Sequence, residues 1–248
     1  MNRSMTSLFW VLKYNPQSEI HNPKSEILKP MPGIIVTSDG SHTIYLPEIN
    51  EHYHSVHGAV QESEHIFLKA GFDTCKADPV NIFEVGFGTG LNALLTAARS
   101  LEGSREVFYT AVEKYPLDDE VMKLLNHRHY TGANGTQLAD AIRMASWGKM
   151  TSICKNFNLL KKKADLLTEA LEGSFDLIYF DAFGPDKQPD MWSREIFEKI
   201  AAVTSSGGIL VTYSCKGEVK RILRAVGFIP EMLPGPPGKR HMMRAVKI

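Results

Sequence analysis

The stretch Glu84-Val85-Gly86-Phe87-Gly88-Thr89-Gly90-Leu91-Asn92 decides the fold, because it joins an apolar run to a helix-forming run. Val80 to Val85 is typical of a buried strand, and Leu91 to Leu101 of the helix that follows. Glycines let the backbone turn tightly and leave room for a ligand against the main chain. The helix points its free N–H groups and the positive end of its dipole at that ligand. The stretch therefore predicts a site for a cofactor of the nucleotide type.

The spacing of the three glycines narrows the choice of cofactor. A dinucleotide fingerprint places glycines at the first, third and sixth positions, and here the sixth position is Leu91. A P-loop needs a Lys-Ser/Thr pair after its last glycine, and here Leu91 and Asn92 follow instead. Glu84, just before the first glycine, disfavours a phosphate and suits a cationic ligand. We therefore expect S-adenosylmethionine, with its sulfonium and amino groups, while a tight turn without any ligand is the alternative.

Composition bounds the class of protein. The chain has 248 residues, enough for one sizeable core, and its 28 basic side chains balance 28 acidic ones. No global field therefore draws it to nucleic acid or membrane, although a local basic patch remains compatible with this balance. Three distant cysteines are typical of reduced thiols in a cytoplasmic protein, and no apolar run is as long as a membrane span.

Strands alternate with helices along most of the chain, which predicts an α/β fold whose parallel sheet is covered on both faces. The expected strands are Val80 to Val85, Val107 to Val112, Ile153 to Leu160, Phe175 to Phe180 and Ile209 to Tyr213. Two adjacent closing strands, 228–233 and 241–246, predict an antiparallel edge. The expected helices include 59–70, 91–101, 117–125, 192–203 with Asp190 as its cap, and 218–226.

The chain divides into three predicted parts. Residues 1–30 are expected to form a loosely ordered extension. Residues 31–78 are expected to form a subregion with a hairpin, signalled by Asp39-Gly40, and a helix. Residues 79–248 are expected to form the cofactor-binding domain.

Acidic residues stand at or near the ends of several predicted strands. Ligands of open α/β sheets bind beyond these carboxyl ends, at the point where the strand order reverses. Glu113 follows the second strand at about the interval where a carboxylate meets ribose hydroxyls, so we expect it to bind the ribose. Asp165 is a candidate for the adenine amino group, although it fits a helix cap equally well.

The loop Asp181-Ala182-Phe183-Gly184-Pro185 begins directly after a buried strand. If that strand neighbours the glycine turn, Asp181 lies beside the cofactor and can orient an amine nucleophile or take its proton. Phe183 and Trp192 are candidates for the walls of a pocket for a flat base. The alternative is a helix-capping loop with buried aromatic side chains.

Two further clusters carry weaker signals. His52, His54 and His57 do not match a known metal-ligand spacing, so we expect no metal site. Lys161 to Lys163 is interpreted as a solvated charge run. Lys239-Arg240-His241 is the best local basic patch, compatible with nucleic-acid phosphates or with a strand that merely has basic ends.

From about Ile34 to the C-terminus, the chain resembles the methyltransferase domain of the bifunctional tRNA 5-methylaminomethyl-2-thiouridine biosynthesis protein family. The resemblance is carried by Glu84 to Asn92, Glu113-Lys114-Tyr115-Pro116-Leu117, Asp181 to Pro185, Gln188-Pro189-Asp190-Met191-Trp192, Glu62 to Leu68 and Gly238 to Met243. It implies a class I methyltransferase (Rossmann-like) fold, S-adenosylmethionine as cofactor, and N-methylation of the aminomethyl group on a tRNA wobble uridine. The chain has no second dinucleotide fingerprint, so we expect the oxidase domain of the bifunctional proteins to be absent.

The resemblance also implies roles for single residues. Asp181 matches the active-site aspartate of the family, Glu113 its ribose-binding acid and Glu62 an acid near the cofactor. The whole expected cofactor site consists of Glu62, Glu84, Gly86, Gly88, Gly90, Leu91, Asn92, Glu113, Lys114, Asp165, Leu166 and Asp181. The expected substrate contacts are Phe183, Trp192, Lys239 and Arg240, with tRNA as the partner and neither metal nor membrane involved.

Three functions remain open at this point. The first is the tRNA methyltransferase. The second is methylation of a small amine or aminopropyl transfer, in which Asp181 and Asp186 would bind the charges of a polyamine. The third is a non-catalytic protein that binds RNA or a partner on a methyltransferase fold.

Overall fold

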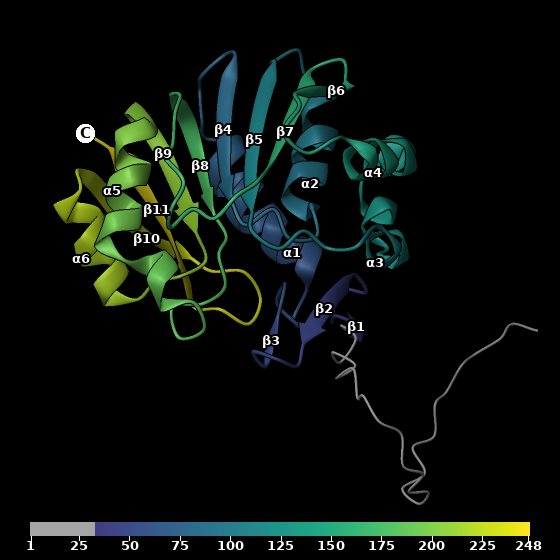
Figure 1. Ribbon diagram of the computed structural model, residues 1–248, viewed down its shortest axis with the longest axis horizontal. Helices are drawn as coiled ribbons and strands as arrows, with labels where there is room; N and C mark the ends of the chain where they lie inside the picture. The colour runs from purple at the N-terminus through teal and green to yellow at the C-terminus, as the bar shows by residue number, and fades with distance from the viewer. Residues whose placement is uncertain (1–32) are drawn as a thin grey trace, which may run out of the picture. The chain divides into compact units, whose positions relative to one another are not determined.

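The computed structural model describes residues 33–248 (Figure 1). The predicted extension, residues 1–30, lies outside this part of the chain. The boundary expected between residues 78 and 79 stays a prediction. Within residues 33–248, no helix has the length and apolar character needed to cross a membrane.

An eight-stranded sheet forms the centre of the described chain, with the strand order β10-β11-β9-β8-β4-β5-β7-β6. Its strands are β4 (Val80–Val85), β5 (Val107–Glu113), β6 (Thr151–Cys154), β7 (Phe157–Lys163), β8 (Phe175–Phe180), β9 (Thr204–Thr212), β10 (Phe228–Pro234) and β11 (His241–Lys247). The strands β7, β5, β4, β8 and β9 pair in parallel, and β11 runs antiparallel between β9 and β10. The α/β fold with an antiparallel edge is thus confirmed.

The strand order reverses at β4, and this places the site. From β4 the chain adds β5 and β7 on one side, then returns to add β8 and β9 on the other. The crevice beyond the carboxyl end of β4 is therefore the switch point at which α/β sheets bind ligands. The glycine turn begins directly after Val85, at this crevice.

One edge of the sheet differs from the prediction. The single strand expected from Ile153 to Leu160 is a hairpin, in which β6 pairs antiparallel with β7. The two strands are separated only by Lys155 and Asn156. A run of mixed apolar and polar residues does not mark such a tight reversal, which explains why the sequence suggested one strand.

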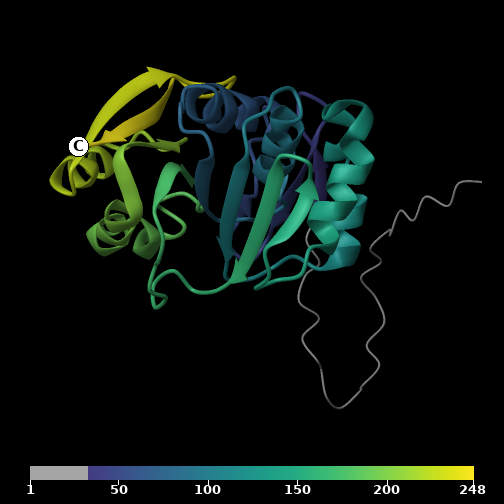
Figure 2. The same cartoon turned by 90° about the horizontal axis from the view of Figure 1, so that it is seen from above.

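Helices cover both faces of the sheet (Figure 2). One face packs against the π-helical segment η1 (Glu64–Phe72), α2 (Leu91–Ser100) and α4 (Gly135–Met144). The other packs against α5 (Arg194–Val203) and α6 (Gly217–Ala225). Successive residues of one strand serve opposite faces, so Ile82 belongs to the first core and Phe83 to the second. Strands buried on both sides are near-continuous apolar runs, and this pattern predicts them from the sequence.

Two helix boundaries correct the prediction. The residue that caps α5 is Ser193, whose Oγ accepts a hydrogen bond from the backbone N–H of Ile196. Asp190 instead lies in the short turn η4 (Pro189–Trp192). The helix expected over 59–70 is α1 (Ala59–Ser63) followed by η1.

The hairpin predicted at Asp39-Gly40 is present as β1 (Gly33–Val36) and β2 (His42–Leu46), joined by β3 (Glu51–His52) in a separate small sheet. The turn is wider than two residues because the Asp39 carboxylate organises it. Asp39 Oδ1 accepts from the Ser41 N–H at 2.9 Å, and Oδ2 accepts from the Gln61 N–H at 2.9 Å. The second bond satisfies a free donor in the first turn of α1, so it ties the hairpin to the domain.

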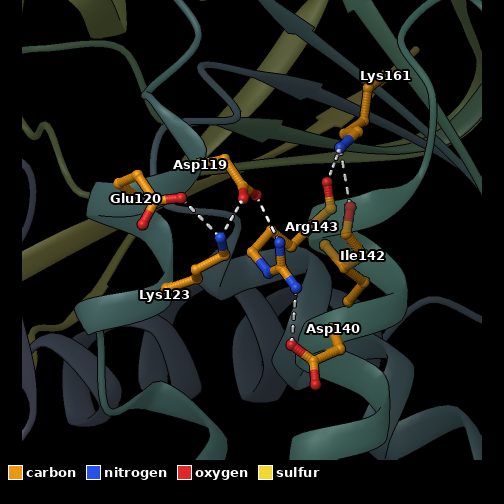
Figure 3. A network of polar contacts seen from close by, with 7 residues as sticks. All are labelled: Asp119, Glu120, Lys123, Asp140, Ile142, Arg143 and Lys161. Atoms are coloured by element: carbon orange, nitrogen blue, oxygen red, sulfur yellow. Dashed lines mark hydrogen bonds and ion pairs between the residues drawn. The ribbon is translucent and has the colours of Figure 1, made fainter.

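Lys161 contradicts the interpretation of 161–163 as a solvated charge run (Figure 3). Its side chain is only 2% exposed, and Nζ donates to the backbone oxygens of Ile142 and Arg143 at 2.8 and 3.1 Å. These carbonyls belong to the last turn of α4, where the helix dipole favours a cation. Burial lowers the pKa of Lys161 to about 8. Lys161 falls on the covered face of β7, whereas Lys163 is exposed.

The helix α3 (Asp119–Leu124) is tied to α4 by the same network (Figure 3). The Arg143 guanidinium pairs with Asp119 at 2.6 Å and with Asp140 at 3.1 Å. Lys123 pairs with Asp119 at 2.9 Å and with Glu120 at 2.7 Å. These ion pairs with largely exposed acids contribute little individually, but together they tie α3 to α4.

Candidate active site

A cavity of about 340 Å³ opens beside the glycine turn. Its walls come from residues 51–62 and from three segments much later in the sequence. Its lining residues are Glu51, His52, Tyr53, His54, Ser55, Val56, Glu62, Asp181, Phe183, Gly184, Tyr213 and Lys239. The cavity therefore lies where the small N-terminal sheet, the loops after β8 and β9, and the loop between β10 and β11 converge.

The glycine turn requires residues without a side chain. Gly86, Gly88 and Gly90 have φ angles of +87°, +50° and +72°, which favour glycine. A Cβ at Gly86 would lie 2.7 Å from the backbone oxygen of Asp181, so the turn and the loop after β8 are in close contact. A Cβ at Gly88 would lie 3.0 Å from the Tyr53 ring. Other parts of the protein, the loop after β8 and the Tyr53 ring, therefore pack closely against the turn on both sides.

Asn92, in the first turn of α2, connects two acids. Its Nδ2 donates to Glu84 Oε1 at 2.9 Å and to Asp181 Oδ2 at 2.8 Å. Glu84 is 1% exposed, and its second carboxylate oxygen has no hydrogen-bond partner among the described residues. Burial raises the pKa of Glu84 well above its ordinary value. Glu84 and Asn92 therefore lie beneath the cavity, where they support Asp181.

Asp181 itself lines the cavity. Burial raises its pKa to about 7, and the nearby charge of Glu62 acts in the same direction. The hydrogen bond from Asn92 and the charge of Lys239 oppose this shift. A carboxyl with a pKa near neutrality is suited to exchanging a proton with an amine.

Glu113 lies at the end of β5 and contacts the glycine turn. Its Oε2 accepts from the Gly88 N–H at 3.0 Å, and Oε1 accepts from the Tyr115 N–H at 2.9 Å. Both oxygens keep a free lone pair. The carboxylate thus holds two loops together and still has acceptors for a ligand.

Lys114 and Asp165 pair with each other at 2.8 Å, next to this acid in the sheet. Asp165 Oδ1 also accepts from the Leu167 N–H at 3.0 Å, as expected for the start of a turn. Leu166 is 3% exposed and belongs to the second core. These residues flank the ends of β5 and β7, outside the 340 Å³ cavity. Leu91, at the start of α2, is likewise buried in the first core.

Two predicted substrate contacts do not line the cavity, and for Trp192 this corrects the prediction. Trp192 is 4% exposed, packs against Phe180 and Phe197, and donates from Nε1 to the Phe183 oxygen at 2.7 Å. It supports the loop from below instead of lining the cavity, because its large ring completes the second core. Arg240 is exposed and also lies outside the cavity lining.

The other two predicted substrate contacts do line the cavity. Phe183 packs edge-on against Tyr53, with ring centroids 5.2 Å apart. Lys239 forms an ion pair with Glu62, and its ammonium lies 4.3 Å from the centroid of the Tyr213 ring. Glu62 also accepts a hydrogen bond from the Ser55 N–H at 3.0 Å.

Eight of the twelve lining residues were not among the predicted site residues, and three of them have side chains placed to act on the site. Tyr53 covers the glycine turn, and His54 shares a hydrogen bond with Thr89 Oγ1 at 2.7 Å. Burial lowers the pKa of His54 to about 3, so its ring is neutral. Tyr213 directly follows β9, so the strand-end rule that identified Asp181 applies to it too. Among the described residues, no cluster of three or more His, Cys, Asp or Glu side chains is arranged to hold a metal ion.

Comparisons with known proteins identify similar chains. The chain is 30% identical over 212 residues to the tRNA 5-methylaminomethyl-2-thiouridine biosynthesis bifunctional protein MnmC of Ralstonia nicotianae, covering 77% of this chain and 31% of that protein. The protein of the same name from Campylobacter hominis is 31% identical over 191 residues, covering 74% and 28%. The chain therefore spans about a third of the length of these relatives.

A solved structure and a family model extend the comparison. The crystal structure of MnmC2 from Aquifex aeolicus matches with a TM-score of 0.72 and 23% identity, covering 89% of this chain and 71% of that one, so the two share a fold. Residues 143–248 match the model of a family described as S-adenosyl-L-methionine-dependent methyltransferase. The resemblance seen in the sequence is confirmed: residues 143–248 match a family of S-adenosyl-L-methionine-dependent methyltransferases, and most of the chain is similar to the MnmC proteins.

Proposed function

We propose that this enzyme methylates the aminomethyl group of a tRNA wobble uridine, in the cytoplasm. The observation that carries the proposal is the position of Asp181. Its carboxyl lines the cavity, its main chain touches the glycine turn, and its pKa is raised to about 7. The names of the similar proteins supply the tRNA substrate.

The residues around the turn fit S-adenosylmethionine. Gly86, Gly88 and Gly90 all have positive φ angles, so the turn is made of backbone without side chains, which leaves main-chain groups free to contact a ligand. Glu113 would accept from the ribose hydroxyls, and the Lys114–Asp165 pair would border the adenine. When bound, the cofactor supplies a methyl group on a positively charged sulfur.

Asp181 would act on the amine. An amine attacks only through its lone pair, so the ammonium form must first lose a proton. A carboxylate in this position accepts that proton or a hydrogen bond and aims the lone pair at the methyl carbon. The bound cofactor would supply the methyl group, with the electron pair of its S–C bond left on sulfur. The one proton lost overall is the proton that Asp181 takes from the ammonium before transfer and passes to solvent, so the methylated nitrogen remains an ammonium.

The alternative of a polyamine held between Asp181 and Asp186 is not favoured. Asp186 is exposed and pairs with Lys216 at 2.5 Å, and it does not line the cavity.

Within the basic patch of residues 239–241, Arg240 remains available to RNA phosphates, because Lys239 pairs with Glu62.

The test is to incubate the protein with methyl-labelled S-adenosylmethionine and bulk tRNA from cells that lack its gene. We expect label in the RNA, and mass analysis of its nucleosides should show a methylaminomethyl uridine. Label in a small-molecule fraction but not in tRNA would replace the substrate with a free amine. If label enters neither tRNA nor a small molecule, the proposal that this chain methylates a tRNA amine is wrong.

A further inference from the structure

Lys239 places a cation inside the cavity. It stands on the loop between β10 and β11, and its ammonium pairs with Glu62. The side chain of Glu62 is only 10% exposed. The ammonium also lies over the face of Tyr213, where the ring quadrupole attracts positive charge. A carboxylate and an aromatic face thus meet one alkylammonium group.

Both partners are held in place without Lys239. Glu62 Oε2 accepts from the Ser55 N–H at 3.0 Å, which orients the carboxylate from the opposite side. The Tyr213 hydroxyl donates to the Ala182 oxygen at 2.7 Å, which fixes the ring beside the loop of Asp181. The receptor for the cation is therefore formed by the scaffold, and Lys239 enters it from a separate loop.

The position of this receptor relates it to catalysis. Glu62, Tyr213 and Asp181 line the same cavity. The charges of Glu62 and Lys239 both act on the Asp181 carboxyl, in opposite directions. A substrate ammonium group bound by Glu62 and Tyr213 would therefore share the cavity with the carboxyl that can take its proton.

We propose that Glu62 and Tyr213 form the subsite for the ammonium group of the substrate, and that Lys239 occupies this subsite as an internal stand-in until the substrate displaces it. The subsite takes a primary or secondary alkylammonium group. The proposal rests on an amine being the methyl acceptor, and it adds the binding step that precedes proton transfer to Asp181.

Other lysines of the same region do not share this arrangement. Lys187 donates to the backbone oxygens of Ile49 and Asn50, each at 3.0 Å, and Lys216 pairs with the exposed Asp186. Neither is a lining residue of the cavity. Lys216→Met therefore serves as a matched control, because it removes a paired ammonium that lies outside the subsite.

The test uses n-butylammonium, which has the length of a lysine side chain, as the probe. Removing the tethered competitor in Lys239→Met should tighten binding of the probe on the order of tenfold or more, since a tethered group competes at millimolar effective concentration or above. Affinity is measured by calorimetry at constant ionic strength, without cofactor or RNA. Lys216→Met should bind the probe as the wild type does, and n-butanol should bind to none of the variants.

Two results would overturn the proposal. The first is equal probe affinity in the wild type and in Lys239→Met. The second is a double variant, Lys239→Met with Glu62→Gln, that binds the probe as tightly as Lys239→Met alone. If Lys239→Met does not fold, the wild type is titrated while the NMR signal of the Lys239 ammonium is followed. Displacement should move this signal to the position of a free lysine, and a signal that stays fixed at saturating probe overturns the proposal.

This measurement is independent of the proposed function. If the probe binds as expected but no amine is methylated, the subsite stands and the proposed function fails. If tRNA is methylated but the probe does not compete with Lys239, the function stands and the stand-in role fails.

Discussion

Asn92 Nδ2 donates a hydrogen bond to Asp181 Oδ2 over 2.8 Å, so the first turn of α2 holds the carboxyl that lines the cavity. The bond favours the ionised form, and it opposes the effect of burial on the pKa of Asp181. The same amide group donates to Glu84, which fixes its orientation. Asn92 is therefore a positioning residue for Asp181, in addition to any contact with the cofactor.

Asn92→Ala should shift the pH dependence of methyl transfer. A hydrogen bond to a charged group is worth roughly 1.5–3 kcal/mol, so its loss should raise the pKa of Asp181 by about one to two units. The rise of the single-turnover rate with pH should then begin about one to two units higher. Asn158→Ala is the control, since Asn158 bonds only the exposed Glu106. An unshifted profile would show that Asn92 does not act through Asp181.

The turn at Gly88 offers a test that separates strain from close approach. Gly88→Ala and Gly148→Ala both force a residue into a positive φ, +50° and +78°. Only at Gly88 does the new Cβ meet a neighbour, the Tyr53 ring at 3.0 Å, whereas nothing lies within 4 Å of it at Gly148. We expect Gly88→Ala to weaken binding of S-adenosylmethionine by at least about tenfold, as a sterically blocked site would. Calorimetry on both folded variants decides, and equal affinities would remove Gly88 from the cofactor site.

Glu113→Ala should weaken cofactor binding in a different way. The substitution removes the acceptor of the Gly88 and Tyr115 N–H groups together with the proposed ribose contacts. Charge-assisted bonds of this kind are worth roughly 1.5–3 kcal/mol, so the affinity should fall by about tenfold or more. Glu106→Ala, at an exposed position before β5, should bind as the wild type does. Binding within twofold of the wild type would mean that Glu113 serves only the loops.

Lys161 should make stability depend on pH. Its pKa is lowered from the ordinary 10.5 to about 8, so between these values the unfolded chain binds the proton more tightly than the folded protein. The free energy of unfolding should therefore rise as the pH increases from about 8 toward 10.5. Lys161→Met should lose this rise in urea titrations, and the exposed Lys163→Met should keep it. Parallel pH profiles for the wild type and Lys161→Met would contradict the burial of the charge.

The sequence was informative where a structural rule is local. The glycine turn, the apolar strands and the acids at strand ends are recorded in consecutive residues, so Glu113 and Asp181 could be placed without knowing any long-range contact. Short-range patterns therefore sufficed to predict the fold that the strand order and the fold shared with MnmC2 confirm. The same strand-end rule would have found Tyr213 had it been applied to β9 as well.

The remainder depends on packing between distant segments. Trp192 and Phe183 are both aromatic residues in one loop. Trp192 is buried only because it packs into the core beneath α5 and α6, which the sequence of the loop does not reveal. Lys161 looks like its exposed neighbours until α4 is laid over its strand. The contact of Lys239 with Glu62 joins residues 177 positions apart, and the basic character of residues 239–241 pointed to an exposed patch instead.

Asp181→Asn should separate catalysis from stability. The substitution keeps the shape of the side chain and removes its charge, so we expect S-adenosylmethionine to bind with similar affinity. Methyl transfer should fall on the order of a hundredfold or more, the usual scale for the loss of a positioned acid–base group. Single-turnover assays at saturating cofactor and tRNA measure this, and the rise of the wild-type rate around pH 7 should be absent from the variant.

Asp181→Asn should also increase the stability of the protein above neutral pH. The pKa of Asp181 rises from the ordinary 3.8 to about 7 on folding, so the folded protein binds the proton more tightly than the unfolded chain. The wild type therefore loses stability as the pH increases from about 4 to 7. At pH 8 the neutral asparagine should therefore make the protein more resistant to urea than the wild type. If the variant transfers methyl groups at the wild-type rate, another residue carries out the chemistry. If the variant is less stable than the wild type at pH 8, burial of the Asp181 carboxylate does not destabilise the folded protein.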